Sequence, residues 1–349
     1  MRLIKVNAEH EYNVTVDCDW RTQLLALAKK RTRVGIIHTQ DMASSIEFDC
    51  DSEVFYFNVP DGEEAKSVAN LTLIWNWLAS AGFTRSDLLV GIGGGAVTDV
   101  SGFAAATWLR GIDWVAIPTS IAGMVDASVG GKTGVNSEFG KNLIGAFHSP
   151  ISVLIDTSWL TSLSERDFSA GMAEVVKCGF IADKAILETL TGKELSNLRE
   201  DLPTVVELIS SAVAVKAAVV SDDFKENFGR EILNYGHTLG HAVEMHSKYS
   251  LRHGEAVSIG LVFAAELAQL KGVLSKELVD AHREILSRLN LPISYPRTAW
   301  PELLPLLALD KKSRGTMIRF VAISDIGHCI RMEGVSESEL LAAYERVSS

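Results

Sequence analysis

The stretch GIGGGAVTDV at residues 91–100 follows a short apolar segment and opens a pattern of helical spacing. Two further glycine-rich stretches follow at 125–136 (VDASVGGKTGVN) and 140–147 (GKNLIGAF), and each carries a lysine. Glycine lets the backbone approach a ligand closely, and exposed N–H groups beside a lysine suit phosphate. One such loop is weak support, but three together predict a site for a dinucleotide and a second phosphorylated or anionic molecule.

The first of these stretches fits the pattern G-x-G-x-x-A through Gly91, Gly93 and Ala96. A dinucleotide fold of the usual kind has an acidic residue about 20 positions later, at the end of the next strand. Here Asp113 begins that strand instead. We therefore expect a diphosphate at the helix N-terminus but not an ordinary ribose contact. The alternative is a tight turn from strand to helix without a ligand.

The first half of the chain alternates segments of strand and helix character, which predicts an open α/β sheet with a parallel core. We place this Rossmann-like domain at residues 1–158, and the glycine-rich stretches within it are the reason to expect a dinucleotide there. The predicted strands are 11–17, 33–38, 53–59, 87–92, 113–117 and 151–155, and the predicted helices are 63–81, 97–109 and 120–128.

Beyond residue 158 the pattern becomes almost entirely helical, which predicts an all-α domain at 159–349. The motifs described below would make it the metal- and substrate-binding domain. One short strand pair is expected at 317–323 and 328–332. The predicted helices are 165–182, 201–221, 228–246, 254–271, 275–289 and 335–347.

The composition limits the class of protein. The chain has 349 residues, a net charge of −11 and 47% hydrophobic residues, as expected of a globular protein with two domains. The negative charge argues against a nucleic-acid partner. Four scattered cysteines, no apolar core of a signal peptide and no apolar run of about 18 residues predict a cytoplasmic protein with reduced thiols and no membrane association.

The segment PDGEEAK at 60–66 precedes a predicted helix. Asp61 is placed to cap that helix, and Glu63 and Lys66 lie three residues apart on one face. As a pair they could hold ribose hydroxyls. The alternative is a solvated helix start.

The second half carries a candidate metal site. Glu174 and Lys177 lie on one face of an otherwise apolar helix, where charges need partners or a metal. NYGHTLGHAVE (234–244) puts His237 and His241 one turn apart, and LRHGEAV (251–257) adds His253. One carboxylate and two imidazoles with an open position describe a catalytic zinc site. The spacing does not decide which two histidines bind, and a histidine of this kind can instead be a hydrogen-bonded core residue.

Basic residues gather around these motifs in an otherwise acidic chain. Such embedded cations predict a polyanionic substrate with phosphate and carboxylate groups, although any single one could be a solvated side chain. They are Arg110, Lys132, Lys141, Lys177, Lys216, Arg230, Lys311 and Lys312.

These motifs, in their order, resemble those of the 3-dehydroquinate synthase family, which belongs to the sugar-phosphate cyclases. The amino-acid sequence of the motifs is most similar to that of actinobacterial members. The resemblance covers roughly 55–335 through PDGEEAK, GGGAVTDVSGFAAATWLRG, VDASVGGKTGVN, GKNLIGAF, AGMAEVVK, KAAVV, REILNYGHTLGHA, HGEAV and DKK. It implies an N-terminal NAD-binding domain, a helical C-terminal domain, a homodimer, NAD+ and one Zn²⁺ that Co²⁺ can replace.

The resemblance also implies residue roles. The metal ligands would be Glu174, His237 and His253. The cofactor-binding residues would be Asp61, Gly62, Glu63, Lys66, Gly94, Gly95, Asp99, Thr119, Ser120, Lys132, Lys141, Trp159, Leu160, Thr161 and Ser162. The catalytic and substrate-binding residues would be Arg110, Asp126, Lys132, Asn142, Lys177, Lys216, Arg230, Asn234, His241 and one of Lys311 and Lys312, with His253 also contacting the substrate.

The implied reaction converts 3-deoxy-D-arabino-heptulosonate 7-phosphate (DAHP) to 3-dehydroquinate and phosphate, the second step of the shikimate route to chorismate and aromatic amino acids. NAD+ oxidises the C5 hydroxyl, phosphate leaves by β-elimination, NADH returns the hydride, and the opened ring closes by an intramolecular aldol reaction. The metal would polarise the C4 and C5 oxygens. Lys132, Asn142 and Arg110 would hold the phosphate, and His241 would relay protons.

The sequence departs from the family pattern at three places. His38-Thr39-Gln40 stands where an acidic residue near the adenosine ribose is common, Ser120 replaces a second threonine, and Cys178 replaces a tyrosine. Three alternative functions stay open. They are another cyclase (aminodehydroquinate or 2-deoxy-scyllo-inosose synthase), a metal-dependent polyol dehydrogenase, which needs no VGGKTGVN or GKN loop, and a non-enzymatic NAD-binding protein.

Overall fold

The computed structural model describes residues 1–224, 229–314 and 318–349, apart from the side chains of 308–314. The chain divides into two compact units. The first comprises Met1–Leu163 and the end of one long helix from Lys216 onward, and the second comprises Ser164–Val215 and the rest of the chain. The predicted boundary between functional domains after residue 158 stays a prediction.

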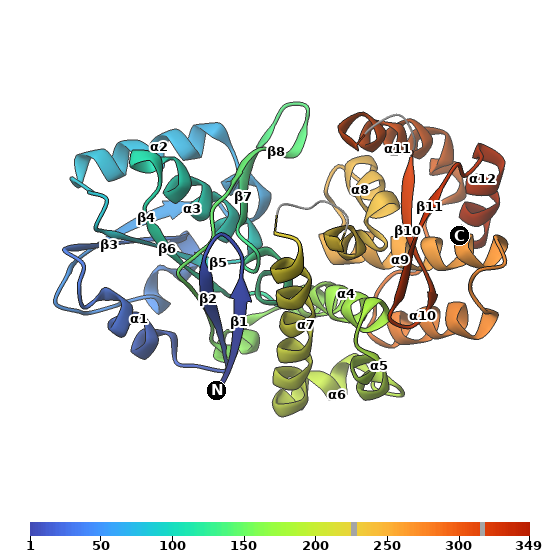
Figure 1. Cartoon of the computed structure of the whole chain (residues 1–349), viewed down its shortest axis with the longest axis horizontal. Helices are drawn as coiled ribbons and strands as arrows, with labels where there is room; N and C mark the ends of the chain where they lie inside the picture. Colours follow the sequence, from blue (N-terminus) through green and yellow to red (C-terminus); the bar gives the residue numbers. More distant parts are fainter. Residues whose placement is uncertain (225–228, 315–317) are drawn as a thin grey trace. The chain divides into compact units, whose positions relative to one another are not determined.

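The first unit contains the predicted open sheet (Figure 1). Its order is β1-β2-β9-β6-β5-β3-β4, and all neighbouring strands are parallel except β1 and β2. The α/β sheet with a parallel core is therefore confirmed, and the edge strand β1, which is mostly exposed, is an addition. The strands are β1 (Arg2–Asn7), β2 (Glu11–Val16), β3 (Arg33–Thr39), β4 (Glu53–Val59), β5 (Leu88–Gly93), β6 (Asp113–Pro118) and β9 (Ser152–Ile155).

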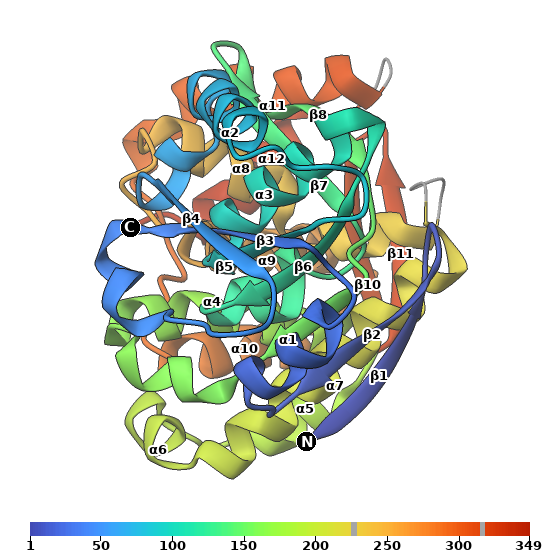
Figure 2. The same ribbon diagram turned by 90° about the vertical axis from the view of Figure 1, so that its left-hand side faces the viewer.

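Helices cover both faces of this sheet (Figures 1 and 2). On one face, Trp20 and Leu24 of α1 (Trp20–Ala28) pack in a core with alternate residues of the central strands, such as Val90. On the other face lie α2 (Val68–Ser80) and α3 (Gly95–Thr107). Because β5 is buried on both sides, its sequence is continuously apolar or glycine, as expected for a central parallel strand.

Three predicted helices have different bounds in the structure. The segment 63–81 is a 3₁₀ turn η2 (Gly62–Ala65) followed by α2, whose N-cap is Ser67. The segment 97–109 is α3, followed by a kinked turn η3 (Trp108–Arg110). The segment 120–128 contains only a π-helical turn η4 (Gly123–Ala127). The other short turns in this unit are η1 (Gln40–Ser45) and η5 (Thr157–Ser162).

The second and third glycine-rich stretches form an antiparallel hairpin of β7 (Lys132–Ser137) and β8 (Gly140–Phe147), which the sequence analysis treats only as loops. Gly134 and Gly145 lie opposite each other in its register. A side chain at Gly134 would meet the Ile144 carbonyl oxygen at 2.7 Å, so these glycines serve strand pairing rather than loop flexibility.

The second unit is a helical bundle with one predicted strand pair, β10 (Arg319–Asp325) and β11 (His328–Glu333). Its centre is α9, which is buried from Gly254 to Ala268 and packs against α4, α8, α10 and α12. The helices are α4 (Glu165–Ile181), α5 (Lys184–Leu190), α6 (Leu195–Glu200), α7 (Leu202–Asp222), α8 (His237–His246), α9 (His253–Leu270), α10 (Lys276–Arg288), α11 (Trp300–Arg314) and α12 (Glu337–Arg346), with 3₁₀ turns η6 (Gly229–Asn234) and η7 (Arg297–Ala299).

Among the described residues, α7 alone is long and apolar enough to cross a membrane by length and composition, with a mean hydropathy of 1.7. The sequence analysis expects no apolar run of about 18 residues, so this helix is longer in apolar residues than expected. A core helix passes the same test, and 56% of the apolar window is buried within the protein. All four cysteines, each within the described ranges, are thiols rather than disulfides, as predicted.

Candidate active site and metal centre

The glycine turn between β5 and α3 forms a compact helix N-terminus. Gly94 is the N-cap with an extended backbone and makes no side-chain cap, and Gly95 begins the helix. A side chain at Gly95 would meet the Cβ of Ala127 at 2.9 Å. Ala127 therefore packs directly against the turn. The first N–H groups of α3 have no intrahelical acceptor and suit an anion.

Two residues predicted to bind the cofactor follow β6 and line this turn. The Thr119 N–H donates to the Gly93 carbonyl at 2.9 Å. The Ser120 hydroxyl accepts from the Gly123 N–H at 3.2 Å. The replacement of threonine by Ser120 therefore keeps a hydroxyl that holds the local backbone.

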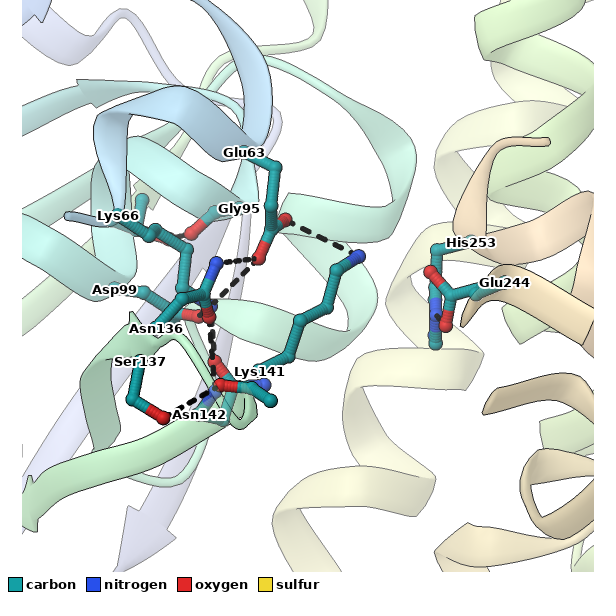
Figure 3. Close-up of polar contacts among 12 residues, drawn as sticks. Glu63, Lys66, Gly95, Asp99, Asn136, Ser137, Lys141, Asn142, Glu244 and His253 are labelled. Atoms are coloured by element: carbon teal, nitrogen blue, oxygen red, sulfur yellow. Dashed lines mark hydrogen bonds and ion pairs between the residues drawn. The ribbon is translucent and has the colours of Figure 1, made fainter. Parts of the chain in front are cut away.

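Lys66 is a buried cation at the centre of a polar network (Figure 3). Its Nζ lies 2.6 Å from Oδ2 of Asp99 on α3 and donates to Oδ1 of Asn142 on β8. Glu63 Oε1 is 3.8 Å away. Burial raises the pKa of the Asp99 carboxyl, and the charge of Lys66 opposes that rise. Lys66 thus joins α3 to the hairpin.

Glu63 connects the same network to the hairpin tip (Figure 3). Its carboxylate accepts from Asn136 Nδ2 at 2.7 Å and lies 3.6 Å from Lys141 Nζ. The Asn142 N–H donates to Asn136 Oδ1 at 3.0 Å, with Asn142 at a φ of 57°. The structure therefore brings together the PDGEEAK and GKN motifs, which lie about 75 residues apart in the sequence.

The expected cap at Asp61 is wrong. Asp61 is the N-cap residue of η2, but its side chain makes no cap hydrogen bond, and Gly62 follows at a φ of 60°. The acceptor role belongs to Ser67, which accepts from the Asn70 N–H at the start of α2. The physical reason is that the chain turns between residues 65 and 68 instead of continuing as one helix.

The remaining predicted cofactor residues form the turn η5. Asp156 caps it by accepting from the Ser158 N–H, and the hydroxyls of Thr161 and Ser162 bond to carbonyls within the turn. Leu160 is buried and Trp159 is half-buried. His38, at the end of β3, is buried with its Nδ1 2.8 Å from the Thr39 carbonyl, so local backbone occupies that nitrogen.

Lys216 and Asp126 form a second, partly buried contact in the first unit. Lys216 Nζ lies 2.6 Å from Asp126 Oδ1 and also donates to the Asp126 carbonyl. Arg110 is exposed on the kinked turn with a φ of 68°, and Lys132 is exposed at the start of β7. The structure brings Lys216 and Asp126 together, and it holds the other two cations at the surface.

The predicted metal ligands converge within the second unit. Glu174 lies on α4, His237 opens α8 and His253 opens α9. The Nε2 atoms of His237 and His253 lie 3.5 and 3.4 Å from Glu174 Oε1, and one donor atom from each residue lies within 4.8 Å of the others. Sequence spacing leaves the choice of histidines open, and this geometry groups Glu174 with His237 and His253.

The electrostatics of this donor set suit a cation. Burial, with a contribution from Lys177, lowers the pKa of His237 to about 3, so this imidazole is neutral and its Nε2 can donate a lone pair. Burial also opposes a charge on His253, but the carboxylates of Glu244 and Glu174 outweigh it and raise its pKa to about 10. The same two carboxylates that stabilise a positive charge on His253 would stabilise a divalent metal bound at its Nε2 in place of the proton. One carboxylate and two imidazoles fit Zn²⁺ or Co²⁺.

Two other predicted catalytic residues, Lys177 and His241, lie next to this donor set, and Arg230 and Asn234 are in the same unit. Lys177 is buried on α4 and pairs with Glu174 Oε2. The ring of His241 lies 5.4 Å from that of His237 between centroids. Arg230 is buried in η6, and Asn234 at the end of η6 has a buried Nδ2 without a hydrogen-bond partner in the described part of the chain. The predicted contact from Lys311 or Lys312 lies outside the described side chains.

The sequence analysis missed Glu244. This buried carboxylate accepts from His253 Nδ1 at 3.1 Å and belongs to a second donor group with His241 and His253. Its spacing offers a signal, since it follows His241 by three residues and His237 by seven and so lies on the same face of α8.

Comparisons with known proteins identify the family of the chain. The models of the N-terminal and C-terminal domains of 3-dehydroquinate synthase match residues 56–170 and 171–313. A 3-dehydroquinate synthase of Thermobifida fusca is 47% identical over 97% of this chain and 94% of its own length. One of Streptomyces avermitilis is 46% identical over 96% and 94%.

Solved structures show the same fold. A 2-epi-5-epi-valiolone synthase of Streptomyces hygroscopicus, solved with NAD+ and Zn²⁺, matches with a TM-score of 0.87, 26% identity and 96% coverage of both chains. A 2-deoxy-scyllo-inosose synthase matches with a TM-score of 0.85, 23% identity and coverage of 99% and 100%. With both domain models matched in order and nearly full-length relatives above 45% identity, the chain belongs to the 3-dehydroquinate synthase family of enzymes.

Proposed function

We propose that the chain converts DAHP to 3-dehydroquinate and phosphate, using NAD+ and one divalent metal, Zn²⁺ or Co²⁺. The observation that carries this proposal is the donor set of Glu174, His237 and His253. A related synthase with NAD+ and Zn²⁺ at 26% identity supports the choice of cofactors. When bound, NAD+ supplies reversible hydride transfer, and the metal supplies polarisation of the adjacent substrate oxygens.

The residues of the first unit would bind the anionic groups. The N–H groups at Gly94 and Gly95 would hold the NAD+ diphosphate. Asn142, Lys132 and Arg110 would hold the substrate phosphate before it leaves. Because Lys66 donates to Asn142 Oδ1, the amide NH₂ of Asn142 is left to point its donors at an anion.

The residues of the second unit would orient the sugar acid and move protons. Lys177, Arg230 and the buried Nδ2 of Asn234 supply donors for carboxylate and hydroxyl oxygens. Lys216, which belongs to the first unit, would add a further cation. His241 would relay the proton of the oxidised hydroxyl, since it lies one turn from His237 on α8.

One assay tests the reaction. Purified protein is incubated with DAHP, catalytic NAD+ and Zn²⁺, and both phosphate and 3-dehydroquinate are followed. We expect stoichiometric release of both without net NADH. Absence of phosphate release would overturn the proposal. Turnover of amino-DAHP in place of DAHP would indicate the aminodehydroquinate synthase reaction, and NADH accumulation from a polyol would indicate a dehydrogenase.

We further propose a cytoplasmic homodimer with functional domains at 1–158 and 159–349. The family resemblance supports these assignments, together with the exposed apolar side chains of Leu143 and Ile144 on β8, which association would cover. Sedimentation equilibrium tests the oligomeric state, and fractionation of the source cells tests the location. Limited proteolysis tests the boundary, with cleavage expected near residue 158.

A further inference from the structure

Each predicted histidine ligand has its second ring nitrogen held by an acceptor. His237 Nδ1 lies 3.2 Å from the Tyr235 carbonyl, and His253 Nδ1 lies 3.1 Å from Glu244 Oε2. Since neither acceptor can donate, Nδ1 of both rings carries the proton. Nε2 of His237 and of His253 lies 3.5 and 3.4 Å from Glu174 Oε1, so it is the nitrogen that would bind the metal once it is unprotonated.

The two acceptors differ in charge. Tyr235 offers a neutral carbonyl, whereas Glu244 offers a carboxylate that is itself 3% exposed. A buried carboxylate on the rear nitrogen makes an imidazole a stronger donor and fixes its ring orientation. His253 needs this support more than His237, because its side chain is 36% exposed whereas that of His237 is 10% exposed and is held by packing.

We propose that Glu244 is a positioning residue of the metal centre, which fixes the tautomer and orientation of His253 and so sets the affinity for the divalent metal. The inference rests on the proposed ligand set and adds a residue to it. It also gives a reason for the burial of Glu244 on α8, since a buried carboxylate is costly unless it has a partner, and His253 is such a partner.

The same atoms allow one competing arrangement, in which Glu244, His241 and His253 bind a metal of their own. The two arrangements differ in stoichiometry. A positioning role leaves one metal per chain, whereas a second ligand set adds another and makes Glu244 a direct ligand.

The test compares three variants with the wild-type full-length protein. In E244Q the side chain keeps its shape and an acceptor oxygen but loses its charge. In E244A the acceptor oxygen and the charge are both lost. E266Q is the matched control, because Glu266 is another buried carboxylate in this unit that pairs with Arg283 and Arg346 instead of a histidine. Zn²⁺ affinity is measured by competition with a chelator, and Co²⁺ coordination by its visible absorption spectrum.

We expect E244A to bind Zn²⁺ about 10- to 100-fold more weakly than wild type, with E244Q between them. The Co²⁺ spectrum should shift in both, and excess metal should restore activity to E244Q. E266Q should lower the melting temperature without changing metal affinity. If E244Q and E244A bind Zn²⁺ as tightly as wild type while E174A loses the metal, the role of Glu244 is overturned but the ligand set stands. Two metals in wild type and one in E244A would overturn it in favour of a second site, and no metal in wild type would overturn the ligand set itself.

Discussion

Lys216 Nζ lies 2.6 Å from Asp126 Oδ1, although 90 residues separate them in the chain. Lys216 comes near the end of α7, and Asp126 lies in the π-helical turn η4. The side chain of Lys216 is 8% exposed and that of Asp126 is 32% exposed. Two predicted substrate contacts therefore hold each other in place before any substrate binds.

Replacing Lys216 by methionine removes this contact and one predicted cation for the substrate. We expect kcat/KM for DAHP to fall about 10- to 100-fold, the size of a lost charged hydrogen bond, with metal content unchanged. K184M is the control, because the Lys184–Glu188 pair is exposed and such pairs contribute little. Equal effects of the two substitutions on kcat/KM would contradict the assignment.

Lys66 should control NAD+ affinity. In K66M the buried Asp99 loses its counter-charge and Asn142 loses its donor. We expect the Kd for NAD+, measured by calorimetry, to rise at least about tenfold and the protein to lose about 3 kcal/mol of stability. The double variant K66M/D99N should recover part of the stability. K5M, which breaks only the exposed pair of Lys5 with Glu11, should change neither quantity.

Removal of one metal ligand should remove the metal and the activity together. E174A and H253A are each expected to contain far less than one equivalent of zinc by elemental analysis and to release no phosphate from DAHP. H246A is the control, because His246 also lies on α8 but bonds to the Tyr295 hydroxyl. Stoichiometric zinc in either ligand variant would disprove the assignment.

Gly254 sets the approach of α9 to α4. A methyl group at this position would overlap the Ala170 carbonyl oxygen, one turn before Glu174. We expect G254A to lower the free energy of unfolding by several kcal/mol, or to weaken zinc binding if the helices separate instead. At Gly272 a side chain meets nothing within 4 Å, so G272A should cost only about 1 kcal/mol for its positive φ. Denaturant unfolding of the two variants measures the difference.

His282 should make stability depend on pH. It stacks on Phe180 and bonds to the Tyr235 hydroxyl and the Leu278 carbonyl, and burial lowers its pKa to about 4. Between pH 6.5 and 4, His282 binds a proton in the unfolded chain but stays neutral in the folded protein. The free energy of unfolding therefore falls as the pH falls. The slope is up to about 1.4 kcal/mol per pH unit. Denaturant unfolding of H282Q over this range should show a slope smaller by that amount.

The sequence alone predicted the α/β half well, because its signals are local. Strand 88–93 is apolar on both faces, and the glycine-rich turn after it is followed at once by a helical pattern. The edge strand β1 escaped prediction because five of its six residues are not buried, which leaves no clear alternation. The hairpin β7–β8 escaped prediction because its glycines resemble loop residues until the two strands are paired.

For the site, the sequence determined which kinds of side chain were available. Charged residues on apolar helices, such as Glu174 and Lys177, and histidines next to glycines mark a metal and anion site through their chemistry. It left open which two histidines join Glu174, because residues at 174, 237 and 253 have no common local spacing.

Only the tertiary structure groups His237 and His253 with Glu174. Gly254 lets α9 approach Ala170 closely, so His253 comes within 3.4 Å of Glu174, and the end of α8 brings Glu244 behind it. In the same way, Lys66 meets Asn142 and Lys216 meets Asp126 only after strands and helices from distant parts of the chain have packed. Local sequence determines propensity and chemistry, whereas the distances between distant side chains depend on how closely the backbones carrying them can pack.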